Sequence, residues 1–306
     1  MKTGFHVFLA AFIALGASWC GFVLAPALQL GTAKQAAVLN SSDIYPVQRS
    51  GDATLGLQVY RASGCAACHT EQIQQTGVAC EIELTSVGKN PAAVEKQINA
   101  LFAPSPFLGV NFITNDQNIP YGGPPSIDIS HLPQIILNHL EKSKADAVVG
   151  GITSAGGKAE IHIIATGTDI ARSWGLRRSV AEDFLWDDPV QLGDIRVGPD
   201  LADVGARLGN ADWQLLHLYT PQSVVKGSVM PPFRFLFETR KIAGAPSPDA
   251  LHLPEELAPP AGFEVVPTDD AKNLAAYLLS LRADVPLYDA PFTALQASTS
   301  APSNKK

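Results

Sequence analysis

The sequence predicts a mainly α-helical protein with an N-terminal transmembrane helix and a small α/β domain inserted into the helical part. Three observations lead to this prediction. An uncharged apolar stretch opens the chain, residues with helical spacing lie near 60 and near 275, and strand-like alternation occurs between 79 and 166. With 306 residues, the chain is long enough for two domains.

The N-terminal stretch from Phe5 to Leu30 carries no Asp, Glu, Lys or Arg. As a helix rising about 1.5 Å per residue it would span roughly 39 Å, enough to cross a hydrocarbon core of about 30 Å with tilt. We therefore expect a retained membrane anchor over residues 1–33, followed by a polar linker up to residue 52. A cleaved signal peptide is the alternative, because Ala25-Pro26-Ala27 fits a cleavage site.

The pentapeptide Cys65-Ala66-Ala67-Cys68-His69 has the C-x-x-C-H pattern of c-type haem attachment. Two thiols three residues apart reach both vinyl groups of a porphyrin, and the following histidine supplies an axial iron ligand. A zinc site is the alternative, but it would need a second pair of ligands, and Cys20 and Cys80 are single. We interpret Cys20 and Cys80 as buried thiols. The sequence thus predicts one covalent haem c, held by Cys65, Cys68 and His69.

Met230 is the candidate for the second axial ligand, because the chain has two methionines and the other is the initiator. It precedes Pro231, and the residue before a proline is disfavoured in helix, which suits a ligand on a stiff loop. Thioether ligation raises the reduction potential, as electron transfer requires. A core methionine in a proline-rich turn is the alternative.

Two helices are predicted at the ends of the haem-binding part. Residues 53–63 have helical spacing, and Gly64 ends that helix before the cysteines. Residues 271–282 follow two aspartates and end in an arginine, which matches the charge preference of helix ends. The apolar residues of the first helix that share a face are Leu55, Val59 and Tyr60. In cytochrome c folds the first and last helices cross, and Tyr60 and Tyr277 are candidates for that crossing.

Several further segments carry a resemblance to a known family. They are Gly56–His69, Arg177–Val180, Asp187–Pro189, Arg196–Leu201, Asp203–Gly205, Asp212-Trp213, His217–Tyr219, Pro221–Val225 and Met230-Pro231. In these segments the chain resembles the membrane-anchored mono-haem subunit II of cbb(3)-type cytochrome c oxidases. The resemblance implies a class I-like cytochrome c domain split into 34–78 and 167–285, with Met230 as ligand. The sequence departs from the family at Thr70–Gln75, where the family has an Arg- and Glu-containing segment.

Other residues near the motif have candidate roles. A carbonyl of a G-P-x-L loop typically accepts the Nδ1–H of the haem histidine in c-type cytochromes, so we assign that role to Pro199, with a plain turn as the alternative. Arg196 could neutralise a haem propionate or be a solvated surface arginine. Trp213 could pack on the haem edge or belong to the core. We interpret His217 as structural.

Residues 79–166 have no counterpart in the oxidase family, and we predict that they form an inserted domain. Segments 80–84 and 158–163 alternate as strands, and 91–102 reads as a helix with a proline in its first turn. Parts of the insert, 80–100 and 133–161, resemble the C-terminal domain of the ribosomal large-subunit stalk protein; residues 104–130 do not match it. The histidines of the insert are interpreted as surface or core residues rather than metal ligands; they are His131, His139 and His162.

The resemblance implies an electron-transfer subunit that does no bond chemistry itself and relays electrons to the oxygen-reducing haem–copper subunit. Its expected partners are that catalytic subunit, other oxidase subunits, and a donor cytochrome or upstream complex. It would be single-pass in the bacterial inner membrane, with the haem on the periplasmic side. The alternatives are the mono-haem small subunit of a nitric oxide reductase-like complex and a membrane-anchored haem sensor.

The net charge of −7, without a basic patch, argues against nucleic acid as a partner. Residues 286–306 are predicted to be disordered.

Overall fold

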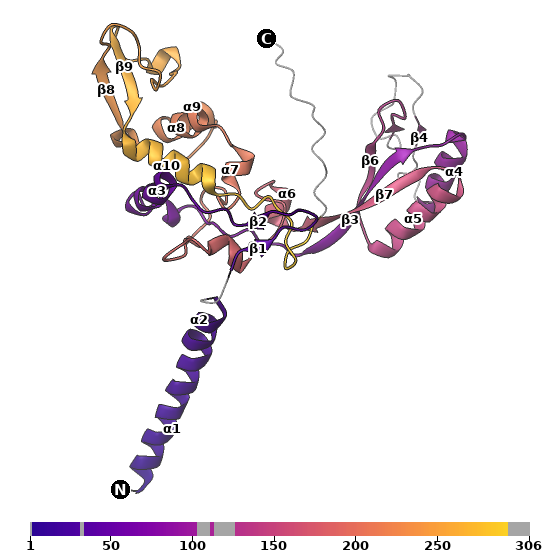
Figure 1. Ribbon diagram of the computed structural model, residues 1–306, viewed down its shortest axis with the longest axis horizontal. Helices are drawn as coiled ribbons and strands as arrows, with labels where there is room; N and C mark the ends of the chain where they lie inside the picture. Colours follow the sequence, from indigo (N-terminus) through magenta and orange to yellow (C-terminus); the bar gives the residue numbers. More distant parts are fainter. Residues whose placement is uncertain (1, 31–33, 103–110, 113–125, 293–306) are drawn as a thin grey trace. The chain divides into compact units, whose positions relative to one another are not determined.

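The computed structural model describes residues 2–30, 34–102, 111–112 and 126–292. It divides into two compact units (Figure 1). Unit 1 contains Met1–Gln72 and Ser179–Asp289, and unit 2 contains Ile73–Arg178 with the residues after Asp289. Part of the Pro- and Gly-rich stretch 104–130 and most of the predicted tail 286–306 lie outside the described residues.

The N-terminal apolar stretch is helical from α1 (Lys2–Trp19) through a π-helical turn (Cys20–Leu24) to α2 (Ala25–Leu30). Pro26 lacks the N–H of a regular helical bond, and a π-turn is a common accommodation next to such a residue. Residues Gly4–Leu28 have a mean hydropathy of 2.2 and are long and apolar enough to cross a membrane. A signal sequence near an N-terminus can meet the same criteria of length and apolarity, so this finding supports both sequence-based alternatives. Cys20 is exposed on this helix, which makes the prediction of a buried thiol wrong there.

The remaining regular elements of unit 1 are mostly helical. The helices are α3 (Gly51–Ala62), α7 (Val204–Arg207), α8 (Ala211–Tyr219), α9 (Pro221–Val224) and α10 (Asp269–Ser280). The strands form two antiparallel pairs, β1 (Ala36–Ala37) with β2 (Ile44–Tyr45) and β8 (Phe237–Lys241) with β9 (Phe263–Pro267). The predicted polar linker up to residue 52 therefore contains a small sheet, which the Tyr45 hydroxyl ties to the core by donating to the Arg282 carbonyl at 2.7 Å.

Helix α3 begins where the Ser50 side chain accepts a hydrogen bond from the Ala53 amide, and its first turn carries Asp52, as the helix dipole favours. The helix ends before Gly64, which has a φ of 71°. Its buried face consists of Ala53, Gly56, Leu57 and Tyr60. The expectation that Leu55 shares the buried face is wrong, since Leu55 is 49% exposed. Ala53 and Gly56 on the buried face are small residues, so the spacing of large apolar residues does not identify this face.

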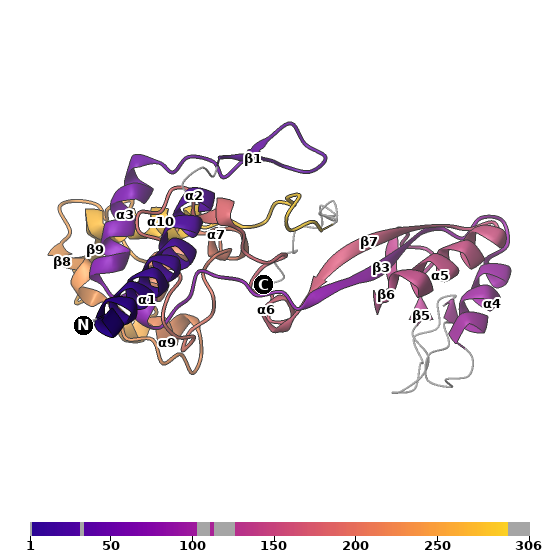
Figure 2. The same cartoon turned by 90° about the horizontal axis from the view of Figure 1, so that it is seen from below.

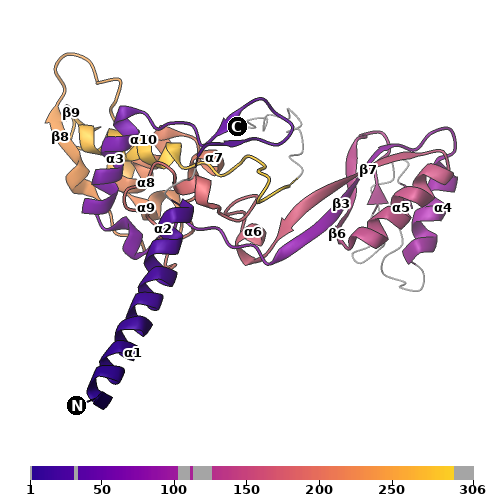
Figure 3. The same ribbon diagram turned by 60° about the horizontal axis from the view of Figure 1, so that its bottom comes forward.

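The predicted crossing of the first and last helices is confirmed (Figures 1 and 3). Helix α10 is capped by Thr268, whose side chain accepts from the Ala271 amide. The rings of Tyr60 and Tyr277 meet at the crossing with 5.1 Å between centroids. A Cβ at position 56 would lie 1.9 Å from the Asn273 carbonyl oxygen, so a glycine is what allows the two backbones to approach this closely.

The core of unit 1 is built around this crossing. Leu274 and Leu278 of α10 pack with Leu57 of α3, while Leu218 of α8 and Val265 of β9 complete the cluster. Strand β9 leads into α10 through Thr268, whose hydroxyl also donates to the Leu236 carbonyl at 2.8 Å. The N-cap residue of α10 is thereby hydrogen-bonded to the residue that precedes strand β8.

Unit 2 is a three-stranded antiparallel sheet with the order β6–β3–β7. Its elements are β3 (Gly77–Ser86), α4 (Pro91–Phe102), β4 (Asn111–Phe112), β5 (Ser126–Ile127), β6 (Gln134–Leu140), α5 (Lys142–Ser154), β7 (Lys158–Thr166) and α6 (Thr168–Ala171). The predicted strands at 80–84 and 158–163 and the predicted helix at 91–102 are confirmed. Because β6 and β7 both run antiparallel to β3 between them, β6–α5–β7 is a split βαβ unit.

One face of the sheet of unit 2 is apolar and carries helices α4 and α5 (Figure 2). Ile82 and Leu84 of β3 are fully buried against Val94, Ile98 and Ile152 of these helices. Cys80 belongs to the same core, which confirms that it is a buried thiol. Side chains alternate along a strand, so the residues between these point to the opposite face.

The two ends of unit 2's sheet pair with each other. Gly77 of β3 lies opposite Thr166 of β7, and the Thr76 amide donates to the Thr166 carbonyl at 2.7 Å. This proximity is what an insertion requires. The exact boundaries 79–166 and 34–78 with 167–285 stay predictions. Among the described residues the structure is mixed α/β, 41% helical and 17% strand, so strands contribute more than a mainly α class suggests.

The helix crossing generates a prediction for Gly56→Ala. The added methyl would collide with the backbone carbonyl of Asn273, which cannot rotate away. We expect the variant to lose about 1–3 kcal/mol of unfolding free energy, as overpacked cores do. Denaturant unfolding of the purified chain measures it. Gly51→Ala is the matched control in the same helix, because a Cβ there meets nothing within 4 Å; equal stability losses in both variants would contradict the crossing argument.

Candidate haem-binding site

The C-x-x-C-H segment is folded into a compact turn directly after α3. Cys65–Ala67 form one 3-10 turn, and the amides of Cys68 and His69 both donate to the Cys65 carbonyl, at 3.1 and 3.0 Å. The left-handed conformation of Gly64 turns the chain into this segment. Cys65 is half-buried, whereas Cys68 is exposed. The turn therefore presents one thiol to the interior and one to the surface.

The Cys65 thiol is neutral at ordinary pH. Burial raises its pKa to about 12, and the neighbouring carboxylate of Glu71 acts in the same direction. Cys65 packs against the core cluster of unit 1. An uncharged, half-buried sulfur suits an apolar contact with the edge of a porphyrin.

His69 is oriented by the loop that contains Pro199. Its Nδ1 lies 2.8 Å from the Pro199 carbonyl oxygen. A carbonyl can only accept, so Nδ1 carries the proton and Nε2 keeps its lone pair for another partner. Gly198 makes this approach possible, because a Cβ there would lie 2.2 Å from Cε1 of the His69 ring. The Gly198 amide also donates to the Cys68 carbonyl at 3.0 Å.

Asp200 fixes this loop to the residues after His69. Its carboxylate is fully buried and accepts from the Thr70 hydroxyl at 2.5 Å and from the Gln72 amide at 2.8 Å. The Leu201 amide donates to the Thr70 carbonyl at 2.7 Å. Sequence reasoning gave Asp200 no role, although its place beside Pro199 in the G-P-x-L loop was a signal. The departure from the family at Thr70 and Gln72 thus falls on residues that hold the loop.

Arg196 contacts the same residues as the Asp200 carboxylate does, Thr70 and Gln72, as well as Asp200 itself. Its Nε donates to the Thr70 hydroxyl at 2.9 Å, its guanidinium also donates to the Gln72 carbonyl, and it lies 3.6 Å from the Asp200 carboxylate. These contacts give Arg196 a role in holding the loop. Its contact with a haem propionate stays a prediction.

A groove in unit 1 brings most of the predicted residues together. It is lined by Tyr60, Cys65, His69, Pro199, Leu201, Val204, Arg207, Leu208, Trp213, Gln214, His217, Leu218, Met230, Leu274 and Leu278. Cys65, His69, Pro199 and Met230 were expected there from the sequence. Arg196 and Cys68 are not among the lining residues. The lining is mainly apolar, with a few polar groups among the leucines and valines.

Met230 reaches the groove from a loop after α9. It is half-buried and packs against the core cluster of unit 1. Its backbone is held at two points, since its carbonyl accepts from the Gln222 side chain at 2.9 Å and its amide donates to the Ser228 hydroxyl at 3.3 Å. The loop therefore carries a thioether into the same groove as the His69 ring.

His217 and Trp213 also line the groove, from successive turns of α8. Their rings are stacked, with 4.8 Å between centroids and 9° between planes. Nδ1 of His217 is buried and has no hydrogen-bond partner among the described residues. Burial lowers the pKa of His217, and the neighbouring His69 lowers it further. The His217 ring is therefore neutral at neutral pH. A neutral imidazole in this position is a potential metal ligand.

Arg207 is a groove residue that sequence reasoning missed. One of its terminal nitrogens donates to the Asp200 carbonyl at 2.6 Å, while its buried Nε has no hydrogen-bond partner in the described part of the chain. An arginine at the end of a short helix carries no sequence signal that distinguishes it from a surface arginine. Its place beside His69 and Met230 comes from the tertiary fold.

A buried polar cluster lies behind the helix crossing. The Tyr277 hydroxyl is 3.0 Å from both carboxyl oxygens of Glu71, and Arg49 pairs with the nearby Asp187. Burial raises the pKa of Glu71 to about 8, and the Asp187 charge adds to the effect, against the opposing hydrogen bond from Tyr277. The Glu71 carboxyl is therefore largely protonated at neutral pH.

A comparison with protein families matches part of this chain. Residues 166–252 match the model of the family described as cytochrome c oxidase, mono-heme subunit/FixO. The matched region contains the Pro199 loop, the groove residues of α8 and Met230, and it begins where strand β7 ends. Among curated proteins, none matches the chain. The family match supports a subunit of an oxidase complex and implies a haem c cofactor.

The contact between Gly198 and His69 generates a prediction for Gly198→Ala. The methyl group would overlap the imidazole, so the ring must move away from the Pro199 carbonyl. We expect a loss of about 1–3 kcal/mol of unfolding free energy together with an altered haem absorption spectrum. Gly150→Ala is the control, since a Cβ there meets nothing within 4 Å. A spectrum unchanged from wild type would show that Gly198 does not position His69.

The buried Glu71 generates a prediction of pH dependence. A carboxyl whose pKa is raised on folding holds its proton more tightly in the folded state, so stability falls as pH rises from the unfolded pKa of 4.5 to about 8. Glu71→Gln stays uncharged and can still accept from Tyr277, so it should lack this fall. Denaturant unfolding at pH 5 and pH 8.5 measures the difference. The exposed Glu255→Gln serves as control and should leave the wild-type profile unchanged; an unaltered profile in Glu71→Gln would contradict the assignment.

Proposed function

We propose that this chain binds one haem c through thioether bonds to Cys65 and Cys68, with His69 and Met230 as its axial ligands. The observation that carries the proposal is the His69 ring, held by the Pro199 carbonyl with Nε2 free, in the groove that Met230 also lines. The C-x-x-C-H turn lies at one edge of this groove. Covalent attachment to the half-buried Cys65 and the exposed Cys68 would leave one side of the group near solvent.

The polar groups of the groove fit a haem. Its lining includes five leucines and Val204, which suit a porphyrin face, and its polar groups include the Nε of Arg207, which has no hydrogen-bond partner among the described residues. A buried guanidinium nitrogen without a partner is costly unless a ligand completes its hydrogen bonds. We assign Arg207 to a haem propionate, alongside the earlier proposal for Arg196. When bound, the haem supplies reversible one-electron chemistry.

Met230 is favoured over His217 as the second axial ligand. The Met230 loop is held at both its amide and its carbonyl, whereas the His217 ring is stacked flat on Trp213. Nδ1 of His217 is buried without a hydrogen-bond partner among the described residues, and that nitrogen could instead bind a water molecule. The sulfur ligand is also the one that suits electron transfer.

We further propose that unit 1 is a class I-like cytochrome c domain that acts as the electron-transfer subunit of a terminal oxidase. The family match and the crossing of α3 with α10 support this reading. The chain would be anchored by its N-terminal helix in the bacterial inner membrane, with the haem on the outer side. It would receive electrons from a cytochrome or an upstream complex and pass them to a haem–copper subunit.

Two other functions are less well supported. A nitric oxide reductase-like complex would use the same anchor and haem, but the family match lies with oxidase subunits. A haem sensor needs a displaceable ligand, and a bound Met230 opposes that.

We propose that residues 79–166 are an inserted module of stalk-domain-like fold, and the paired ends of β3 and β7 support the insertion.

The function is tested by deleting the chain from membranes of its host. Electron entry into the oxidase should stop, so that oxygen uptake driven by reduced cytochrome is lost while the haems of the catalytic subunit remain visible in the spectrum. A chain with Cys65→Ala and Cys68→Ala should still assemble but fail to restore uptake. If the chain purifies without a multi-helix haem–copper subunit in mild detergent and its deletion leaves oxygen uptake unchanged, the oxidase function is wrong.

Axial ligation is tested with Met230→Ala and His217→Ala. If sulfur binds the iron, the ferric protein shows a weak sulfur-to-iron absorption band at ~695 nm, which Met230→Ala should abolish and His217→Ala should retain. Met230→Ala should also let carbon monoxide bind the ferrous protein. The reverse result, with the band absent in wild type and carbon monoxide binding only to His217→Ala, would make His217 the ligand.

A further inference from the structure

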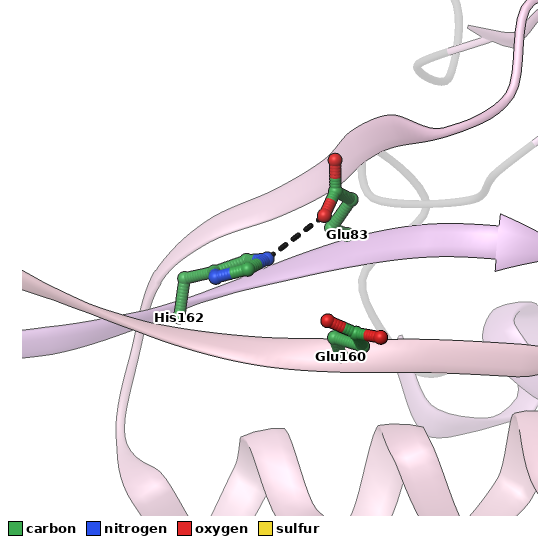
Figure 4. Close-up of side chains that lie close together, drawn as sticks. All are labelled: Glu83, Glu160 and His162. Atoms are coloured by element: carbon green, nitrogen blue, oxygen red, sulfur yellow. Dashed lines mark hydrogen bonds and ion pairs between the residues drawn. The ribbon is translucent and has the colours of Figure 1, made fainter. Parts of the chain in front are cut away.

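The polar face of the sheet in unit 2 carries a cluster of potential metal ligands. Glu83 lies on β3, and Glu160 and His162 lie two residues apart on the adjacent β7 (Figure 4). One carboxylate oxygen of each glutamate and one imidazole nitrogen all lie within 4.8 Å of one another. The cluster is on the face opposite helices α4 and α5, separate from the haem-binding groove of unit 1.

The strand register places two like charges side by side. Glu83 is the direct cross-strand partner of Glu160. Carboxylates directly opposite each other on one face of a sheet repel and destabilise the pair. Lys158, on the same face of β7, forms no ion pair within the part of the chain that the structure describes. A bound cation would relieve this repulsion.

His162 is a preformed ligand in this cluster. Its side chain is only 10% exposed, although it lies on the face without helices, and its Nε2 is 2.9 Å from the Glu83 carboxylate. Its Nδ1 is buried and lacks a hydrogen-bond partner among the described residues. Because packing holds the ring in place, little conformational entropy remains to be lost when a ligand binds.

We propose that Glu83, Glu160 and His162 bind one divalent cation of the borderline class, with Zn²⁺ as the preferred ion. Imidazole nitrogen together with two carboxylates is a ligand set that suits zinc. The two carboxylates neutralise the charge of the cation, and the proton on Nε2 of His162 moves to Nδ1 as the metal takes its place on Nε2. Glu160 is exposed, so the ion can enter from solvent and keep a water molecule as a further ligand.

Equilibrium dialysis of the detergent-solubilised full chain against Zn²⁺, followed by elemental analysis, tests the proposal. Wild type should bind one Zn²⁺ per chain at this site, and zinc X-ray absorption should report oxygen and nitrogen ligands without sulfur. Glu160→Gln should weaken binding by about tenfold or more, as should His162→Gln, because each removes one of three ligands. Glu160→Gln is the more decisive of the two variants, because Glu160 is exposed and its substitution leaves the core of unit 2 intact.

His131→Gln is the matched control in the same unit. His131 also contacts a carboxylate, with Nδ1 at 2.6 Å from Asp128, but that pair is exposed and no third His, Cys, Asp or Glu of the described residues joins it, so the variant should bind Zn²⁺ like wild type. The proposal is overturned if wild type shows no saturable zinc binding, if sulfur appears among the ligands, or if Glu160→Gln and His131→Gln bind equally well. Because the readout is zinc content, it is independent of haem and of oxidase activity.

Discussion

The hydrogen bond between Nδ1 of His69 and the Pro199 carbonyl is the contact on which the proposed site depends. It selects the tautomer of the ring and leaves Nε2 available. Gly198 allows the loop to come this close, and the buried Asp200 holds it there through Thr70 and Gln72. If this loop moved, the groove would keep its leucines but lose the orientation of the His69 ring.

The helix crossing supplies the rigid frame behind that contact. Gly56 lets α3 and α10 approach closely, and α3 leads directly into the C-x-x-C-H turn, so the position of the turn is set by the crossing. The tyrosine of α10 reaches Glu71, two residues beyond His69. Both sides of the C-x-x-C-H turn are therefore tied to the same pair of helices, one by packing and the other by a buried hydrogen bond.

Unit 2 is organised differently, because it is built on a sheet that carries helices on one face only. Alternation along β3 and β7 sends Ile82 and Leu84 into the helical layer and sends Glu83 and His162 to the other side. The same alternation that makes the strands predictable also concentrates carboxylates and an imidazole on the uncovered face. The chain thereby carries the proposed haem site and the proposed divalent-cation site on different units.

The sequence by itself determined the local features: the apolar N-terminal helix, the capped helices at both ends of unit 1, the alternating strands of unit 2, and the pattern Cys65, Cys68 and His69. These depend on spacing and composition, which act over a few residues. The tertiary structure decided what depends on distant segments meeting. It exposed Leu55 and buried Gly56 instead, since the crossing needs a small residue. It also brought Arg207 and His217 into the groove that His69 lines, and Asp200 into contact with Thr70. No periodicity encodes such contacts, because they arise only when residues more than a hundred positions apart pack together.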